Sequence, residues 1–353
     1  MTSSRWKNDM GYGEEALRRR NRYRVVRKLR ERSRSKVGSF DDALEEVGSY
    51  GRWQRLILWL IVFPACIPCG LHAFSQVFMS QIPPHRCRLS EQIENLINSS
   101  ADLKLLLPLT QGGDVDRCRE FDVTAETLLQ ALNGVAPLAN ETWTKTACRN
   151  GWAFNMSATP SSIVSQFELV CDKDYFPPLA LALFNAGSFF GIALFGFISD
   201  WYGRRKAFFL CLLVEVVAGF GTGISPNFTA FCIARFMVGL TIPAIWQIPF
   251  IIGLEFVGAK NRGFVTVFTC FWFTLGLLML GGMAFLSQDW KILSYVTAAP
   301  LIPFFLGYWF LPESPRWNLR QGNVDEAIET LRKIGEVNGK ALTERVTSRL
   351  KVR

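Results

Sequence analysis

Charged side chains are almost absent from six long stretches of this 353-residue sequence. A soluble helix of similar length would carry a polar face, but these stretches carry only scattered Ser, Thr, Asn and Gln and a few charges. Each is long enough to cross a bilayer, which requires about 20 mainly apolar residues. The expected membrane-spanning helices are 56–78, 178–199, 207–224, 229–254, 264–287 and 292–311. The sequence therefore predicts an all-α membrane protein.

Motifs for catalysis and cofactor binding are missing as well. The sequence has no Gly-Lys-Thr nucleotide-binding loop, no recognisable catalytic triad and no metal-ligand cluster, so neither an enzyme nor a bound cofactor is expected. Cys66 and Cys69 form a C-x-x-C pair without further ligands nearby, which does not predict a metal site. About 55 polar residues precede the first apolar stretch, so no cleavable signal peptide is expected.

The distribution of basic residues predicts the orientation. Residues 1–55 contain 15 Lys and Arg against 8 Asp and Glu, and the loop 200–206 adds three basic residues. The loops 225–228 and 288–291 contain only one Lys and one Asp between them. Because cytoplasmic loops carry the excess of Lys and Arg, both termini are predicted to be cytoplasmic.

The two ends of the chain fit this orientation. The Arg-rich run in 1–55 could form a nucleic-acid patch, but beside a spanning helix it more simply fixes topology and touches anionic lipid. No nucleic-acid partner is therefore expected. In 312–353, the spacing of Val324, Ile328 and Leu331 predicts an amphipathic cytoplasmic linker helix.

The segment 79–176 is the expected extracellular loop, with 8 basic and 12 acidic residues. It contains the cysteines Cys87, Cys118, Cys148 and Cys171. An even number of cysteines in an extracellular loop implies two disulfides, with three possible pairings. The same loop contains the glycosylation sequons at Asn98, Asn140 and Asn155. A fourth sequon, Asn227, lies in a tight turn near the membrane and is expected to be unused.

Three motifs resemble a known family. The stretch GFISDWYGRRK at 196–206 resembles the loop signature between the second and third helices of the major facilitator superfamily, and RFMVG at 235–239 resembles its R-x-x-x-G element. LPESPRW at 311–317 is similar to the signature of the organic ion transporters, solute carrier family 22. The resemblance extends from about residue 39 to 340, and ARFMVGLTIPAIWQIPF is most similar to insect members that move carcinine or β-alanine.

The resemblance implies the six-helix amino-terminal half of a major facilitator fold in the plasma membrane. Such transporters move small organic ions by alternating access, in which two halves rock around a central site. The candidate substrate-binding residues are Trp246, Asn185, Gln247, Phe250 and Phe273. An aromatic ring beside a Pro-interrupted helix can bind an ammonium group, although an aromatic in a spanning helix can equally pack on lipid.

Charged residues at the cytoplasmic helix ends are candidates for a gate. They are Asp200, Arg204, Arg205, Glu255, Glu313 and Arg316. Opposite charges at helix ends form charge-assisted hydrogen bonds, and contacts made in one conformation bias a two-state equilibrium. Together these residues are expected to hold the cytoplasmic side closed. The alternative is that the basic loop is only a topology signal.

Three ionisable groups lie in predicted spans. Glu215 is costly at mid-membrane, and its expected partner is Arg235; the alternatives are a protonated Glu215 or a contact with a cationic substrate. His72 is expected at the outer end of the first span, as an interfacial residue with one hydrogen bond or as a pH-sensitive gate.

The chain departs from the family in two ways. Trp201 stands where the loop signature usually has a basic residue, and the chain has six spanning helices where the family has twelve. A transporter of organic cations or zwitterions is therefore expected to need a second half. The alternative is a half-length protein without transport activity that binds a full-length transporter in the membrane.

Overall fold

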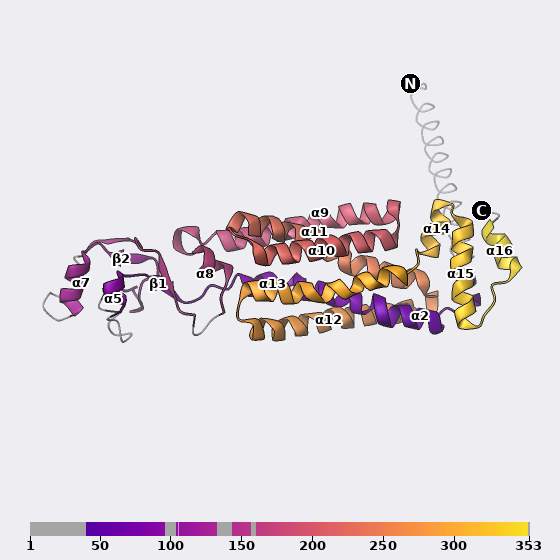
Figure 1. Cartoon of the computed structure of the whole chain (residues 1–353), viewed down its shortest axis with the longest axis horizontal. Helices are drawn as coiled ribbons and strands as arrows, with labels where there is room; N and C mark the ends of the chain where they lie inside the picture. The colour runs from indigo at the N-terminus through magenta and orange to yellow at the C-terminus, as the bar shows by residue number, and fades with distance from the viewer. Residues whose placement is uncertain (1–39, 96–103, 105, 133–142, 157–159, 352–353) are drawn as a thin grey trace, which may run out of the picture.

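The computed structural model describes residues 40–95, 104, 106–132, 143–156 and 160–351. In this part of the chain, six helices are long and apolar enough to cross a membrane. They lie side by side in an elongated bundle (Figure 1). We call the end that carries α14–α16 the linker end, and the opposite end, which carries the strands, the loop end.

The first span, Arg52–Met79, is irregular. It comprises α2 (Arg52–Ile57), the π-helical η1 (Leu58–Val62), the 3₁₀-helical η2 (Pro64–Cys66), α3 (Ile67–Ala73) and α4 (Ser75–Met79). Proline cannot donate the backbone hydrogen bond of a continuous helix and its ring clashes with the preceding turn. Pro64 and Pro68 therefore account for the change of helix type in mid-span.

The remaining spans are more regular. They are α9 (Phe176–Tyr202), α10 (Arg204–Ile224), α11 (Phe228–Phe256), α12 (Arg262–Ser287) with η4 (Ala259–Asn261) before it, and α13 (Trp290–Ala298) continued by η5 (Ala299–Trp309). Asn227 caps α11 by accepting a hydrogen bond from the backbone N–H of Ala230, and Asp289 caps α13 in the same way. The side chain of the fourth sequon residue thus caps a helix.

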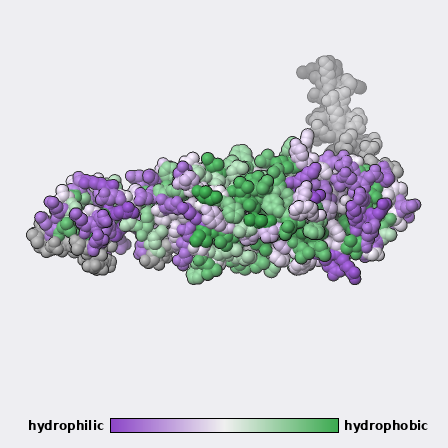
Figure 2. All heavy atoms as spheres, viewed as in Figure 1, coloured by the Kyte–Doolittle hydropathy of each residue, from purple (hydrophilic) through white to green (hydrophobic). Residues whose placement is uncertain are grey.

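The face of the bundle seen in Figure 2 carries an apolar band between two polar ends. Phe285 and Leu286 are 76% and 80% exposed, which would be unfavourable in water over so large a surface. The band matches the hydrocarbon core of a bilayer. The chain is therefore a multi-pass membrane protein.

Glycines allow the spans to approach closely. A Cβ atom on Gly187 or Gly191 of α9 would collide with the backbone of α11, and one on Gly239 would collide with the backbone of α9. Gly70 and Gly276 make the same kind of contact between α3 and α12. Small residues at such crossings let helices gain dispersion energy where no hydrophobic effect acts.

The described residues of the loop end include four short strands that the sequence did not predict. Strand β1 (His85–Cys87) pairs antiparallel with β4 (Trp152–Phe154), and β2 (Arg119–Phe121) pairs with β3 (Lys145–Ala147). The short helices here are α5 (Glu91–Glu94), α7 (Ala125–Leu132), α8 (Ile163–Phe167) and η3 (Cys171–Lys173). Disulfides join Cys87 to Cys148 and Cys118 to Cys171, one of the three possible pairings.

The linker end is a helical layer packed on the bundle. It comprises a helical segment over residues 40–46, α14 (Pro315–Gln321), α15 (Val324–Asn338) and α16 (Glu344–Lys351). Leu44 and Val47 pack with the buried face of α15, which confirms the amphipathic helix expected there. Asn338 of α15 donates hydrogen bonds to the carbonyl of Val47 and the side chain of Gln54, both at 2.9 Å.

The glycine contacts lead to a stability prediction. Gly191→Leu should destabilise the bundle by about 1 to 3 kcal/mol, because the larger side chain must displace the backbone of α11. Gly196→Leu in the same helix is the matched control, since a Cβ atom there would have nothing within 4 Å. Thermal unfolding in detergent should show a clear loss for the first variant only; equal unfolding temperatures would contradict the packing shown.

Candidate functional site

Glu313 caps the amino terminus of α10 at the linker end. Its Oε1 accepts hydrogen bonds from the backbone N–H groups of Arg204 at 2.8 Å and Arg205 at 3.1 Å, the first two residues of the helix. The N–H of Ser314 donates to the same oxygen at 3.1 Å. The first N–H groups of a helix have no partner within it, and its dipole favours an anion there. One carboxylate thus satisfies three donors.

Gly203 makes this approach possible. It connects α9 to α10 with a φ of 109°, a conformation that side chains disfavour. A Cβ atom at this position would also collide with the carboxylate of Glu313. The glycine of the loop signature is therefore required twice, for the turn and for the cap.

Arg204 contacts two carboxylates. Its side chain donates to Asp200 Oδ1 at 2.5 Å, and its Nε lies 3.6 Å from Oε1 of Glu255 on α11. The Asp200 side chain is 51% exposed, whereas the side chains of Arg204 and Glu255 are only 10% and 11% exposed. Exposed ion pairs contribute little, so the contact with Glu255 is the more sensitive to loss of one partner.

Arg205 contacts Tyr308 and neither of these carboxylates. It donates to the backbone oxygen of Tyr308 at 2.5 Å, and its guanidinium carbon lies 4.1 Å from the centre of the Tyr308 ring. Glu255, one of the candidate gate residues, therefore lies against Arg204 and not against Arg205. Arg205 instead ties the start of α10 to the end of η5.

A second cluster at the linker end centres on Asp41, which no sequence pattern indicated. Its Oδ1 accepts hydrogen bonds from Arg262 at 2.6 Å and Arg316 at 2.7 Å. Burial lowers the pKa of the Arg316 guanidinium, and the neighbouring Asp41 carboxylate opposes this shift. Arg316 thus joins α14 to the amino-terminal segment, and Arg262 joins the start of α12 to it. Arg316 lies next to the Arg204 cluster, in which it was expected, and not within it.

Side chains from α14 also bind the end of α9. The indole N–H of Trp317 and the amide of Gln321 both donate to the backbone oxygen of Asp200, at 2.8 Å and 3.0 Å. This carbonyl has no partner within its own helix. Trp317 belongs to the PESPRW stretch, in which only the charged residues were expected to make contacts.

Arg235 is buried in the bundle with neutral partners. Its Nε donates to Gln76 Oε1 at 2.5 Å, and a terminal nitrogen donates to Ser75 Oγ at 3.0 Å, both in α4. Its guanidinium also lies over the ring of Phe184, 5.1 Å from the centre. Arg235 thus joins α11 to the first span and to α9.

Glu215 lies in a different cluster. Thr241 of α11 donates a hydrogen bond to its Oε2, and His72 Nδ1 lies 3.6 Å from its Oε1. The other ring nitrogen of His72 contacts the backbone oxygen of Thr297 at 3.1 Å. Because a carbonyl oxygen only accepts, Nε2 must carry a hydrogen.

These contacts differ from two sequence expectations. The expected ion pair between Glu215 and Arg235 is not present among the described residues. Glu215 contacts Thr241, and Thr241 lies six residues along α11 from Arg235. Six helical residues span about 9 Å along the axis. His72 is also not exposed, as an interfacial residue would be: it lies on α3, is 1% exposed and contacts Glu215 of α10 and Thr297 of α13.

The expected substrate-binding residues lie on three helices. Trp246 and Phe250 of α11 stack with their ring centres 5.2 Å apart and an angle of 15° between the planes. Gln247 of α11 and Asn185 of α9 are exposed, while Phe273 of α12 is partly buried. Three of the five candidates, Trp246, Gln247 and Phe250, thus lie close together in sequence on the Pro-interrupted α11. The other two, Asn185 and Phe273, lie on the neighbouring helices α9 and α12.

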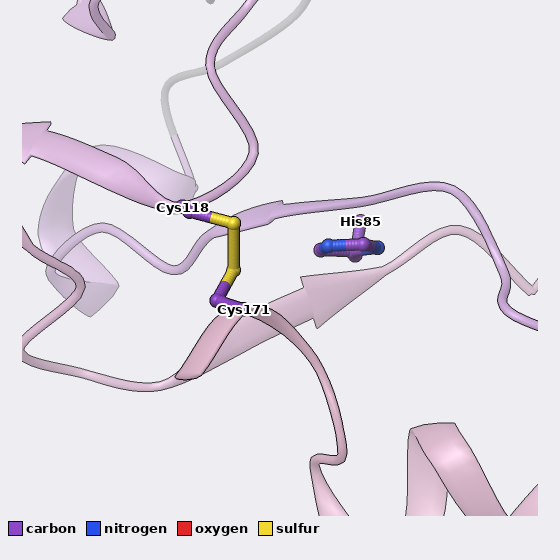
Figure 3. Close-up of side chains that lie close together, drawn as sticks. All are labelled: His85, Cys118 and Cys171. Atoms are coloured by element: carbon purple, nitrogen blue, oxygen red, sulfur yellow. A yellow bond between two sulfur atoms is a disulfide. The ribbon is translucent and has the colours of Figure 1, made fainter. Parts of the chain in front are cut away.

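One group at the loop end has the composition of a metal site. His85 lies beside Cys118 and Cys171, close enough for the three to share an ion (Figure 3). The two cysteines are bonded to each other, however, so they offer no thiolate. His85 contacts the backbone oxygen of Pro83 at 3.0 Å instead.

The sequons fall at the same end. Asn155 is exposed next to β4, where a glycan has access from solvent. Asn98 and Asn140 lie outside the described residues.

Comparison with known proteins gives the family. Residues 150–349 match the family described as "Sugar (and other) transporter". The chain belongs to this transporter family. Its members are transporters and not enzymes, as the missing catalytic motifs indicated.

Curated relatives of this family member confirm the resemblance to solute carrier family 22. The Carcinine transporter of Drosophila melanogaster is 39% identical over 88% of this chain and 47% of its own length. The Beta-alanine transporter of the same species is 33% identical, over 88% and 54%. Solute carrier family 22 member 20 of Mus musculus is 34% identical, over 88% and 55%. The chain spans about half the length of these relatives.

The cap on α10 leads to a prediction for this transporter family member. Glu313→Ala should lower its stability by about 0.5 to 2 kcal/mol, the usual effect of losing a helix cap. Asp200→Ala should cost less than about 1 kcal/mol, because its ion pair is half exposed.

Thermal unfolding in detergent measures both effects. Glu336→Ala is the matched control, because this glutamate is exposed on α15. If Glu313→Ala unfolded at the same temperature as this control, Glu313 would not be a stabilising cap.

Proposed function

We propose that the chain forms the amino-terminal half of an alternating-access transporter of small organic cations or zwitterions. The observation that carries this proposal is the surface of α11, where stacked aromatic rings adjoin an exposed amide in an otherwise apolar bundle. Relatives named for carcinine and β-alanine transport support the substrate class. Both names denote small molecules with an amino group.

The chemistry of this surface suits such a ligand. The face of an indole attracts an ammonium group most strongly when water is excluded, and Trp246 lies within the α11 span with its ring stacked on that of Phe250. Gln247 can accept a hydrogen bond from the same ammonium group or donate one to a carboxylate. Asn185 and Phe273, on α9 and α12, would extend the site on either side.

The proposal includes a partner that covers this surface. The spans containing α9 and α12 are the least buried of the six, with 22% of their apolar windows buried. Lipid would solvate their apolar residues but not the amides of Asn185 and Gln247. A second six-helix half, supplied by more of the same chain or by another transporter, would enclose these amides in a cavity.

The charged linker end would then control access. Asp200, Arg204, Arg205, Glu255, Glu313 and Arg316 are proposed to stabilise the conformation that is closed on the cytoplasmic side. Their contacts with α9, α10, α11 and η5 support this role. These contacts join helix ends of the same half, so they would hold those ends in the arrangement that meets a second half on the cytoplasmic side.

The alternative is a membrane partner of a full-length transporter that has no transport activity of its own. It would use the same exposed helices, α9 and α12, to bind the other protein. Uptake measurements distinguish the two.

Uptake should depend on Trp246. Cells expressing the chain together with the second half of a full-length relative should take up labelled carcinine or β-alanine. Trp246→Ala should weaken the apparent affinity by about threefold to thirtyfold, the range of a buried cation–π contact. Trp246→Phe keeps a ring and should retain most of it.

Two results would count against these assignments. Unchanged affinity and rate in Trp246→Ala would remove Trp246 from the site. If coexpression gave no uptake, while the chain altered uptake by a full-length relative, the non-transporting alternative would replace the proposal.

The proposed orientation, with both termini cytoplasmic in the plasma membrane, has its own test. Glycosidase treatment of the expressed chain should increase its gel mobility, and Asn155→Gln should remove one step of that shift, because only luminal and extracellular sequons are modified. Asn227→Gln should change nothing. Absence of any glycan, together with cytosolic protease cleavage of the segment 79–176, would reverse the orientation.

A further inference from the structure

An apolar groove runs between the first and last spans near the linker end. Its volume is about 480 Å³, and it is lined by α2, η1, Pro64 and η5. All ten lining residues are apolar, including Leu60, Pro303 and Gly307. Leu60 and Leu306 are 66% and 64% exposed, so the groove opens towards the lipid.

A second hollow continues the groove at the linker end. Phe310 lines both, and the second hollow has a volume of about 320 Å³. It lies between the end of η5, the start of α10 and α15, and its lining includes Trp53, Trp309 and Thr330. The charged residues in this lining are Arg205 and Lys333, both basic.

Tyr308 holds the Arg205 side chain in place, but some of the N–H groups of Arg205 have no acceptor in the part of the chain that the structure describes. Its contacts with the carbonyl and ring of Tyr308 fix the guanidinium at the hollow. Its Nε is buried and has no hydrogen-bond partner among the described residues. A guanidinium carries five N–H donors, and the hydrogen bond to Tyr308 uses one of them, so donors remain for an anion in the hollow.

Lys333 is available to the same anion. It pairs with Glu329 at 2.7 Å, but both side chains are more than 60% exposed. Such a surface ion pair contributes little and is easily exchanged. The hollow therefore presents two cations to a ligand.

We propose that the two hollows together bind one anionic phospholipid, with its phosphate between Arg205 and Lys333 and an acyl chain in the apolar groove. The order of the two hollows matches the molecule: the basic part is lined by residues of the linker helix α15 and the start of α10, and the apolar part is lined by residues of the first and last spans. Trp309, 74% exposed, lies at the boundary where tryptophan anchors to lipid headgroups. Basic pockets of this kind between spanning helices bind anionic headgroups, whereas a free phosphate would leave the groove unused.

The lipid would link α15 to the spans. Lys333 belongs to the linker helix, Arg205 to α10 and Gly307 to η5. The site does not depend on the proposed transport function, and only the assignment of the lipid to the inner leaflet rests on the proposed orientation.

Native mass spectrometry of the purified chain in mild detergent tests the headgroup contact. The chain should bind dioleoylphosphatidylglycerol more tightly than dioleoylphosphatidylcholine. Lys333→Gln should weaken phosphatidylglycerol binding about fivefold, the effect of one basic residue near an anionic lipid. Lys351→Gln is the matched control: Lys351 also pairs with a carboxylate, that of Asp325 at 3.0 Å, away from the hollow. Its affinity should stay within about twofold of the wild type.

Gly307→Leu tests the groove. A Cβ atom at Gly307 would meet Ile61 at ordinary contact distances, so the leucine fits but occupies the groove, and both lipids should bind more weakly. Gly281→Leu on α12, where nothing lies within 4 Å of the added Cβ, should leave binding unchanged.

Three outcomes would overturn the proposal. They are equal affinities for the two lipids, equal losses in Lys333→Gln and Lys351→Gln, and full displacement of phosphatidylglycerol by inorganic phosphate. The last would assign the basic hollow to a free anion. Lys333 is 68% exposed, so its substitution leaves the fold intact and the test remains decisive.

Discussion

The bilayer offers no water to polar groups, so every buried charge in this bundle must find its partners inside the protein. This constraint decides where the helices cross. Arg235 uses Gln76 and Ser75 of the first span, and Glu215 uses Thr241 of α11 and lies against His72. Each contact joins two or more helices. The polar side chains therefore fix which faces of the apolar helices meet, and the glycine contacts set how closely.

At the linker end, an ion pair and a helix cap contribute differently to stability. The Asp200–Arg204 pair is short but half exposed, and such pairs contribute about 0 to 1 kcal/mol. Glu313 instead accepts three backbone hydrogen bonds at the start of α10. A charged cap of this kind is worth more than a surface pair. The cap therefore governs the shape of this end, and the visible ion pair adds to it.

Sequence alone predicted the six spans, the amphipathic α15 and the disulfide-bonded loop, because each follows from composition or spacing along the chain. It also placed Asp200, Arg204 and Glu313 in one region, since helix ends on one side of a membrane must lie near each other. It did not predict that Asp41 binds Arg262 and Arg316, because these residues are more than 200 positions apart. The contacts of Glu215 with Thr241 and His72 were not predicted for a related reason. Each residue advances a helix by about 1.5 Å, so a small error in a span boundary changes which residues of two helices lie at the same depth.

The contacts at the linker end also bear on how such a half would move. Glu313, Trp317 and Gln321 attach α14 and its preceding turn to α9 and α10. Asp41 attaches the amino-terminal segment to α12 and α14. All of these partners belong to the same six-helix unit, so the contacts hold this unit together as one body. In the proposed transporter, rocking would then take place at its exposed helices, α9 and α12, against a second half. Asp200 fits this division of roles, because its backbone oxygen is bound within the unit while its side chain remains half exposed and able to meet a partner.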